Sequence, residues 1–207
     1  MKRRVLSVCI ALMAVLGIAF GSAGAASATP IPPDANGYKF WSPSVCVDGS
    51  AINGTYYRVG YLAQQWNLRA PILALDYEDD CAAAGYPPSR RMVIGTFNNP
   101  ASDCLALTNG QVDTVNGYHR WTNGPGMYIN IGVASCVSSQ TRRDHIVSQA
   151  IGYLLGLQVL GSSGYNSRVM NNTTYSWDNV GLPDQNSGNT VEAIYGYAYC
   201  QPFGTVC

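Results

Sequence analysis

The sequence has few charged residues and very few histidines. Charged side chains make up 12% of its 207 residues, and the only histidines are His119 and His145. No basic stripe is present to collect phosphate groups, so nucleic acid is not an expected partner. No C-x-x-C pair occurs either, which disfavours a metal site built from cysteine thiolates.

Long apolar runs are also scarce, and the one that occurs is Val5 to Phe20. A basic start precedes it and small residues ending in Ala28 follow it, the layout of a cleaved secretory signal; an uncleaved anchor is the alternative. We expect residues 1–28 to be the signal, 29–37 a loose arm, and 38–207 a single domain. After cleavage of the signal, we expect the mature protein to be secreted, extracellular and free of the membrane.

The number of cysteines in the rest of the chain predicts disulfide bonds. Six cysteines follow the predicted signal, and an even number in a secreted chain implies three disulfides. Fifteen connectivities are available for six cysteines. We predict the pairs Cys81–Cys104, Cys200–Cys207 and, by remainder, Cys46–Cys136.

Periodicity and turn signals predict an α+β order of elements. Apolar residues at helical spacing indicate a helix over 55–68, and a capping pattern at Thr141 to Asp144 opens a longer helix that Gly156 or Gly161 would end. The remaining predictions are strands at 72–77, 91–97 and 127–133, hairpin turns at Asn109-Gly110 and Asn116-Gly117 flanked by 105–107 and 117–121, irregular chain over 162–189, and a short helix at 190–196.

The long helix carries the most specific pattern, SQAIGYLLGLQVLG at 148–161, followed by SRVMN at 167–171. This stretch resembles the metzincin zinc proteases, which carry H-E-x-x-H-x-x-G-x-x-H and then a Met-turn. Two histidines four residues apart lie on one helical face and reach one zinc ion. The glutamate acts as the general base, and the glycine lets the chain turn so that the third histidine can bind.

The three histidines and the glutamate of that motif are replaced in this chain. Gln149 and Tyr153 stand in the places of the first two histidines, Val159 stands in the place of the third, and Ala150 replaces the glutamate. Gly156 matches the glycine of the motif. An amide is a weak zinc ligand, a phenol keeps its proton until about pH 10, and the other two side chains offer nothing. No catalytic residue, metal ligand or cofactor is therefore expected, and zinc in particular is expected to be absent.

The resemblance still implies a fold. It favours a metzincin-like domain of the short secreted matrixin-like or snapalysin-like form, with a twisted sheet, two main helices, an irregular segment bearing Met170 as the Met-turn, and a short C-terminal helix. Gly152, Leu155 and Leu157 match the residues that usually surround the zinc ligands in the HELGHxLGL form of the motif. EAIYG at 192–196 is similar to the last helix of matrixin domains. The alternative is an unrelated α+β domain.

The implied function is that of a monomeric pseudo-protease, which binds a peptide or protein ligand without cutting it. His145 lies one helical turn before Gln149, so we expect His145, Gln149 and Tyr153 to border the remaining cleft. One alternative is an active hydrolase with a non-standard site using His145, His119 and the carboxylates at 78–80. Another is a structural cell-surface domain with exposed aromatic residues.

Three further patterns carry weaker signals. The carboxylates at 78–80 could hold calcium, although no D-x-D-x-D-G loop accompanies them and a solvated loop is the simpler interpretation. Asn53 and Asn172 each open an N-x-T glycan acceptor pattern. Ser148 lies near the helix, but no G-x-S-x-G context supports a nucleophile.

Overall fold

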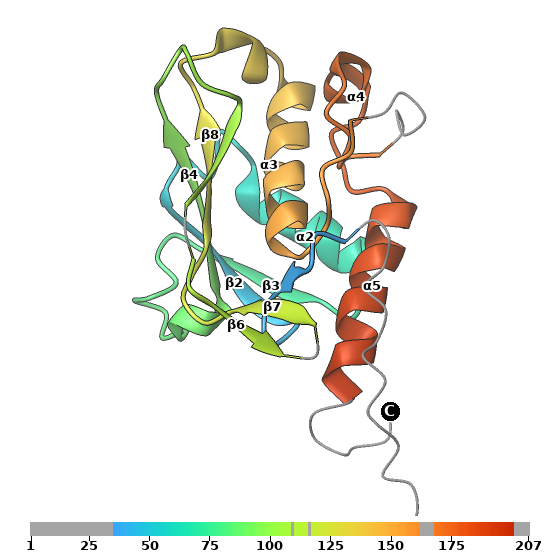
Figure 1. Ribbon diagram of the computed structural model, residues 1–207. Coiled ribbons are helices and arrows are strands. Elements are labelled where there is room, and N and C mark those ends of the chain that lie inside the picture. Colours follow the sequence, from blue (N-terminus) through green and yellow to red (C-terminus); the bar gives the residue numbers. More distant parts are fainter. Residues whose placement is uncertain (1–34, 109, 116, 162–167, 201–207) are drawn as a thin grey trace, which may run out of the picture.

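The computed structural model describes residues 35–200, except for 109, 116 and 162–167 (Figure 1). Its main sheet has five strands in the order β3-β2-β4-β8-β5, all parallel except β5, which runs antiparallel to β8. These strands are β2 (Ser44–Ala51), β3 (Ala74–Glu78), β4 (Arg91–Phe97), β5 (Leu105–Thr108) and β8 (Gly126–Asn130). The α+β class expected from the sequence is present.

A second, smaller sheet has three strands in the order β1-β7-β6. Its strands are β1 (Tyr38–Lys39), β6 (Val112–Val115) and β7 (Tyr118–Trp121). Strand β1 runs parallel to β7, and β6 runs antiparallel to it. Trp121 fixes this sheet to the rest of the molecule, because its indole Nε1 donates to the backbone oxygen of Leu154 at 3.3 Å.

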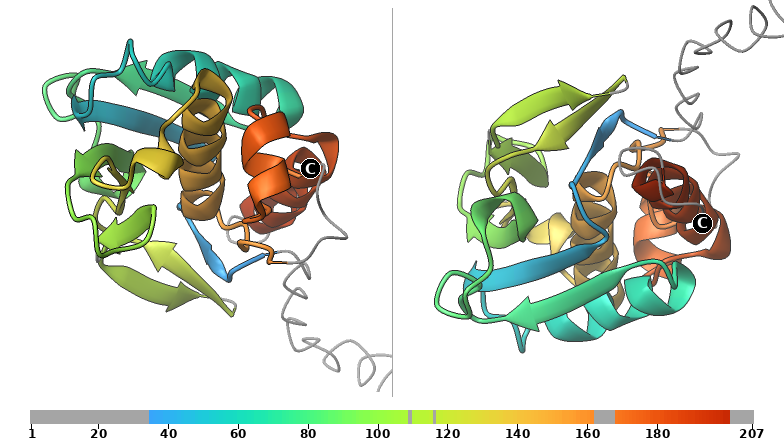
Figure 2. Two further views of the ribbon diagram at one scale, coloured as in Figure 1. Left: turned by 90° about the horizontal axis from the view of Figure 1, so that it is seen from above. Right: turned by 90° about the horizontal axis from the view of Figure 1, so that it is seen from below.

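Helix α3 (Gln140–Leu154) lies at the centre of the molecule, between the main sheet and the C-terminal helices (Figure 2). The other α-helices are α2 (Val59–Arg69), α4 (Thr174–Asn179) and α5 (Gln185–Cys200), with short 3₁₀ turns at η1 (Pro88–Arg90) and η2 (Ala134–Cys136). From Asp144 to Leu154, every α3 residue except Tyr153 is buried. A helix covered on all sides has no solvent-facing stripe, so its polar residues must find partners inside the protein.

Several sequence predictions are met by these elements. The helix expected over 55–68 is α2, although residues before Val59 form turns and Arg58 takes a left-handed conformation with φ of 52°. The strand expected at 91–97 is β4. The strands expected at 72–77 and 127–133 are β3 and β8, shifted or shortened by a few residues.

Four elements were missed or misplaced by sequence reasoning. Strand β2 was missed because SVCVDGSA contains Asp48, yet this carboxylate is buried and accepts the N–H groups of Ser50 and Cys81. Strand β1 and helix α4 are too short to show a period. The C-terminal helix, expected from 190, begins at Gln185.

Two predicted turn features need correction. The Asn109-Gly110 signal does not make a hairpin, because β5 and β6 belong to different sheets; only the 116–117 connection joins two paired strands, with Gly117 at φ 82°. The long helix is capped by Ser139 rather than from Thr141. The Ser139 hydroxyl accepts the N–H of Arg142 at 3.2 Å, which satisfies one of the free donors of the first turn.

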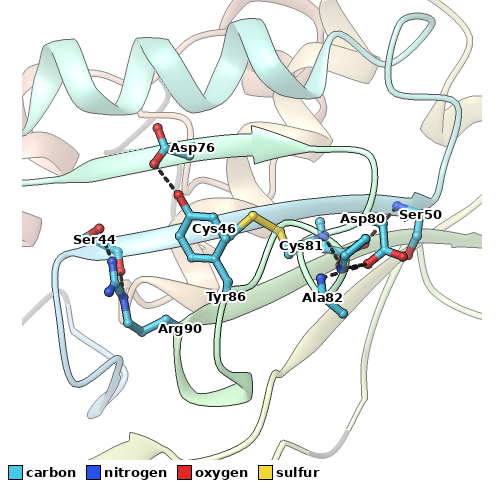
Figure 3. Close-up of a disulfide and its surroundings, with 11 residues drawn as sticks. Ser44, Cys46, Ser50, Asp76, Asp80, Cys81, Ala82, Tyr86 and Arg90 are labelled. Carbon is cyan, nitrogen blue, oxygen red and sulfur yellow. Dashed lines mark hydrogen bonds between the residues drawn. A yellow bond between two sulfur atoms is a disulfide. The ribbon is translucent and has the colours of Figure 1, made fainter.

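The predicted disulfide pairs Cys81–Cys104 and Cys46–Cys136 are wrong. The structure pairs Cys46 with Cys81, whose Cα atoms are 6.0 Å apart (Figure 3), and it pairs Cys104 with Cys136, whose Cα atoms are 5.6 Å apart. Each bond joins neighbouring strands: Cys81 follows β3 beside Cys46 on β2, whereas Cys104 and Cys136 flank the paired strands β5 and β8. Strand order, which spacing does not reveal, decides the pairing.

Several predictions fall wholly or partly outside the described residues. The signal at 1–28 and most of the arm at 29–37 lie there, and so does Cys207, so the pair Cys200–Cys207 stays a prediction. In the part of the chain that the structure describes, no helix is long and apolar enough to cross a membrane.

Candidate functional site

The end of helix α3 is a sharp turn at Gly156. Its φ of 108° lies in the region that glycine reaches without steric cost, and a Cβ there would collide with the backbone oxygen of Tyr38. Asn36 holds the turn in place: its N–H donates to the Gly156 oxygen at 2.7 Å, and its side-chain Nδ2 donates to the oxygens of Tyr153 and Leu157. The glycine therefore ends α3 and turns the chain, as the motif predicted.

Met170 lies against the same helix. It is buried, and a Cβ added to Gly152 would come within 2.6 Å of the Met170 sulfur and 2.8 Å of the Trp66 ring. Leu160 N–H donates to the Met170 oxygen at 2.8 Å, and Asn172 N–H donates to the Leu160 oxygen at 2.7 Å. These bonds hold the segment around Met170 beside the chain that leaves α3.

The five motif positions separate into two groups. Gln149, Ala150 and Gly156 are buried, whereas Tyr153 and Val159 are half-buried and line a cleft of about 350 Å³. The prediction that His145 and Gln149 would border this cleft is corrected, because His145 has 0% and Gln149 2% of its surface exposed and neither lines it. The lining residues are Asp103, Cys104, Leu105, Leu107, Met127, Tyr153, Val159, Asn172 and Trp177.

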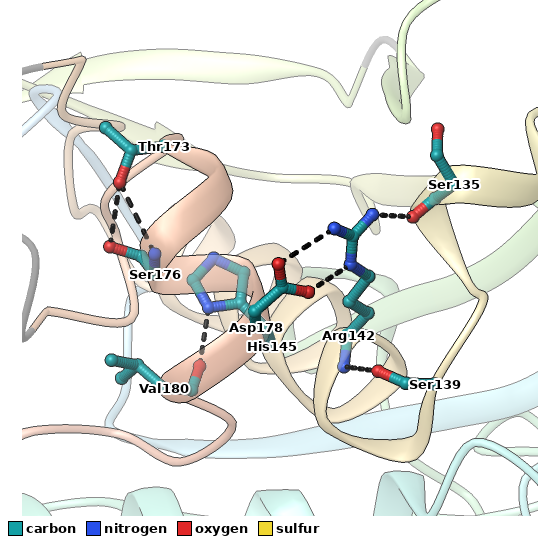
Figure 4. Close-up of polar contacts among 8 residues, drawn as sticks. All are labelled: Ser135, Ser139, Arg142, His145, Thr173, Ser176, Asp178 and Val180. Atoms are coloured by element: carbon teal, nitrogen blue, oxygen red, sulfur yellow. Dashed lines mark hydrogen bonds and ion pairs between the residues drawn. The ribbon is translucent and has the colours of Figure 1, made fainter.

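Helix α4 is what covers the polar face of α3 (Figure 4). Arg142 of α3 makes a two-pronged ion pair with Asp178 of α4, at 2.5 and 3.0 Å. The chain leaving α4 adds two bonds, from His145 Nδ1 to the Val180 oxygen at 2.6 Å and from the Ser148 hydroxyl to the Gly181 oxygen at 3.1 Å. The candidate site residue His145 is thereby used in packing and has no access to a substrate.

The cleft is lined mainly by apolar and aromatic side chains, with Asp103 and Asn172 as polar members. Burial raises the pKa of the Tyr153 phenol above its ordinary value of 10, so this group stays neutral at physiological pH. Burial also lowers the pKa of His145, although hydrogen bonds to backbone oxygens oppose this shift. Among the described residues, the buried nitrogens without a hydrogen-bond partner include Gln149 Nε2 and Trp177 Nε1, which lie near or on α4.

The donor set at the motif positions does not fit a zinc ion. Gln149 offers an amide, Tyr153 a phenol whose raised pKa keeps it protonated, and Val159 a hydrocarbon. His145 cannot substitute for them, since its Nδ1 is bonded to the Val180 oxygen inside the packed interior. Among the described residues, no group of three or more His, Cys, Asp or Glu side chains is placed to hold a metal ion.

The cleft lies against the edge strand of the main sheet, because Leu105 and Leu107 of β5 line it. Strand β5 is the last strand in the sheet order, and no other described strand pairs with its outer edge. Asn130 N–H donates to the Cys104 oxygen at 2.9 Å, so by the alternation of an antiparallel ladder Ala106 and Thr108 also bond to β8. The backbone N–H and C=O groups of Leu105 and Leu107 then point away from the sheet.

The other candidate residues lie elsewhere. His119 is exposed on β7, where its Nδ1 lies 3.0 Å from the Thr114 hydroxyl. The carboxylates at 78–80 are exposed at the end of β3, where Asp80 accepts the backbone N–H groups of Ala82 and Ala83. Asn53 is exposed in a turn before α2. The structure therefore does not bring His119, His145 and these carboxylates into one site.

Sequence reasoning missed most of the cleft lining. Trp177 sits on α4, which was not predicted, and Leu107 and Met127 were assigned only to strands. Asn172 was noted only as the start of a glycan acceptor pattern. No known protein-family model matches this chain, and a search of curated protein sequences finds no match either.

Proposed function

We propose that the chain is a secreted pseudo-protease with a metzincin-like scaffold, and that it binds an extended peptide in the cleft beside β5 without cutting it. The turn at Gly156 and the packing of Met170 against Gly152 support the scaffold. The unreactive side chains at Gln149, Ala150, Tyr153 and Val159 support the absence of hydrolysis. Disulfides are typical of oxidising compartments, which supports a location outside the cell.

One observation carries the binding proposal: an open strand edge lies directly beside an apolar cleft. An extended peptide can pair with the free backbone groups of Leu105 and Leu107, as a strand added to a sheet. Side chains on one face of that peptide would then enter the cleft, since successive side chains of a strand alternate between faces. There they would meet Leu107, which is 40% exposed, and the rings of Tyr153 and Trp177.

The test uses a substitution that removes one outward N–H without breaking the sheet. Leu107→Pro deletes a donor that points away from β8, and edge strands tolerate proline at such positions. For a peptide selected by display on the wild-type protein, we expect Leu107→Pro to weaken binding about tenfold, from loss of one hydrogen bond of about 1 kcal/mol and the local geometry it fixes. Titration calorimetry measures the change.

Two matched variants separate the possible causes of weaker binding. Leu107→Ala keeps the N–H and removes most of the side chain, so it separates backbone pairing from cleft contact. Ala106→Pro removes a donor that faces β8, so it should destabilise the fold itself. A folded Leu107→Pro protein that binds the selected peptide with wild-type affinity would contradict pairing along β5, and failure to select any peptide would contradict the binding proposal.

The rival function is a hydrolase that uses His145, His119 or the carboxylates at 78–80. His145 is enclosed and His119 is in the other sheet, so no observation favours this reading over peptide binding. Metal analysis and a casein cleavage assay on purified protein distinguish the two. One tightly held zinc ion per chain, or cleavage that His145→Ala abolishes, would overturn the pseudo-protease proposal.

A further inference from the structure

The three-stranded sheet carries two cationic side chains next to each other. Lys39 on β1 and Arg120 on β7 are register partners on adjacent parallel strands, so both project from the same face. Both are buried, with 6% and 5% of their surface exposed. Placing like charges side by side away from water costs free energy, so the arrangement requires a compensating group.

Aromatic rings supply part of that compensation. Lys39 Nζ lies 4.2 Å from the centroid of the Tyr118 ring, and Arg120 Cζ lies 3.1 Å from the centroid of the Trp41 ring. Cation–π contacts of this kind contribute on the order of 1 kcal/mol each. They do not neutralise charge, however, so the two cations still require counter-ions.

The carboxylates nearby are too few. Asp113 Oδ1 lies 3.6 Å from Arg120 Nε, and within the described part of the chain no other acidic group is within ion-pair distance of either cation. The cluster therefore has two positive charges and one negative charge. Burial, and to a smaller extent the charge of Arg120, lower the pKa of Lys39 to about 8.

The outer nitrogens of both side chains keep some contact with solvent, although each residue as a whole is buried. Of their nitrogen atoms, only Arg120 Nε is enclosed without a hydrogen bond, and it faces Asp113. Lys39 Nζ and the two Arg120 Nη atoms make no hydrogen bond among the described residues, yet they are not sealed from solvent. The ring of Trp41, which lies against the Arg120 guanidinium, is 44% exposed and borders this group of nitrogens.

We propose that Lys39 and Arg120 form a binding site for one monovalent carboxylate group. A single negative charge balances the one uncompensated positive charge of the cluster, whereas a phosphate dianion would leave an excess negative charge. Arg120 offers a planar fork suited to a carboxylate, and Lys39 offers a point charge beside it. This site lies on the smaller sheet, uses none of the cleft residues, and does not depend on the peptide-binding proposal.

The sequence provides an unusually direct reporter for this site. Lysine occurs only at positions 2 and 39, so a full-length Lys2→Arg chain contains Lys39 as its sole lysine. Biosynthetic incorporation of ¹³Cε-labelled lysine then gives one NMR signal, whose pH titration reports the Lys39 ammonium alone. Acetate and inorganic phosphate serve as probes, with sodium chloride at matched ionic strength as the control for screening.

Saturating acetate should raise the Lys39 pKa by about one unit, because bound carboxylate favours the charged amine. By linkage, acetate should bind about tenfold more tightly at pH 7 than at pH 10. Phosphate should shift the pKa less at equal concentration. A Lys39 pKa that responds to acetate no more than to chloride would overturn the proposal.

Charge variants of the two neighbours should act in opposite directions. Arg120→Gln should abolish the response to acetate, whereas Asp113→Asn should strengthen acetate binding by removing the competing carboxylate. Arg69→Gln makes the same charge change as Arg120→Gln, but on the exposed end of α2, and should leave the titration unchanged. If Arg120→Gln does not fold, the Asp113→Asn result still decides: weaker or unchanged acetate binding there would overturn the assignment.

Discussion

At the scale of single residues, the main finding concerns the polar side chains of α3. Helical spacing placed His145 and Gln149 on the face of Tyr153, but it could not show what lies above that face. In the structure, α4 and the chain leaving it cover His145 and Ser148 and accept their hydrogen bonds. A histidine that looked like a site residue therefore contributes to packing instead.

The pH dependence of stability should reveal this role. Burial lowers the pKa of His145 below its ordinary value of 6.5, so the unfolded chain binds a proton more readily than the folded one. The contribution of neutral His145 is present above pH 6.5 and is lost as the pH falls through the lowered folded pKa. We expect His145→Asn, whose amide can still donate to the Val180 oxygen, to show a shallower fall in unfolding free energy below about pH 6.5.

Urea unfolding at a series of pH values measures this slope. His119→Gln is the matched control, because it removes the other histidine of the chain, which is exposed on β7. Parallel pH profiles for wild type and His145→Asn would show that His145 is not held neutral by burial.

At the scale of elements, the informative unit is the segment from α3 through Gly156 to Met170. Its backbone turns where the motif requires, and Met170 lies beneath the helix at Gly152. Tyr153 and Val159 line the cleft together, although they are six positions apart in the sequence. The positions that would carry zinc ligands in a metzincin are thus partly brought together while their side chains are unreactive.

Restoring the histidines and the glutamate of the zinc motif tests whether these four positions correspond to those of a metzincin. A chain with Gln149→His, Ala150→Glu, Tyr153→His and Val159→His should gain zinc affinity with a Kd of about 1 μM or tighter, which corresponds to about −8 kcal/mol. Competition with a chromogenic chelator measures it. A chain with Val159 left in place is the control, since two histidines should bind at least tenfold more weakly. A folded quadruple variant without zinc affinity would refute the proposed alignment.

At the scale of the whole molecule, the two disulfides connect neighbouring strands at opposite sides of the main sheet. Cys46–Cys81 joins β2 to the chain after β3, and Cys104–Cys136 joins the beginning of β5 to the chain after β8. Because Cys104 lines the cleft, the second bond also anchors the edge strand to which we assign peptide binding.

Replacing Cys104 and Cys136 by serine should lower the unfolding free energy by about 3–4 kcal/mol, the chain-entropy value for a loop spanning 32 residues. Denaturant unfolding measures this loss. Non-reducing peptide mapping provides the independent check. Recovery of a Cys81–Cys104 linkage, or a loss below about 1 kcal/mol, would contradict the observed pairing.

The sequence determined the elements whose signal is local. The spacing of apolar residues located α2 and α3, and Gly156 was one of two glycines expected to end the central helix. These features depend on neighbours a few residues apart, so they can be read along the chain. The poor zinc-ligand character of Gln149, Tyr153 and Val159 could also be read there, because it follows from side-chain identity.

Only the tertiary structure decided what depends on distant contacts. Strand order set the disulfide pairs, the packing of α4 enclosed His145, and the position of β5 at the sheet edge created the cleft beside Tyr153. The pairing of Lys39 with Arg120 joins residues 81 positions apart through the register of β1 and β7. Burial and strand register are properties of the folded chain, because they depend on which segments meet.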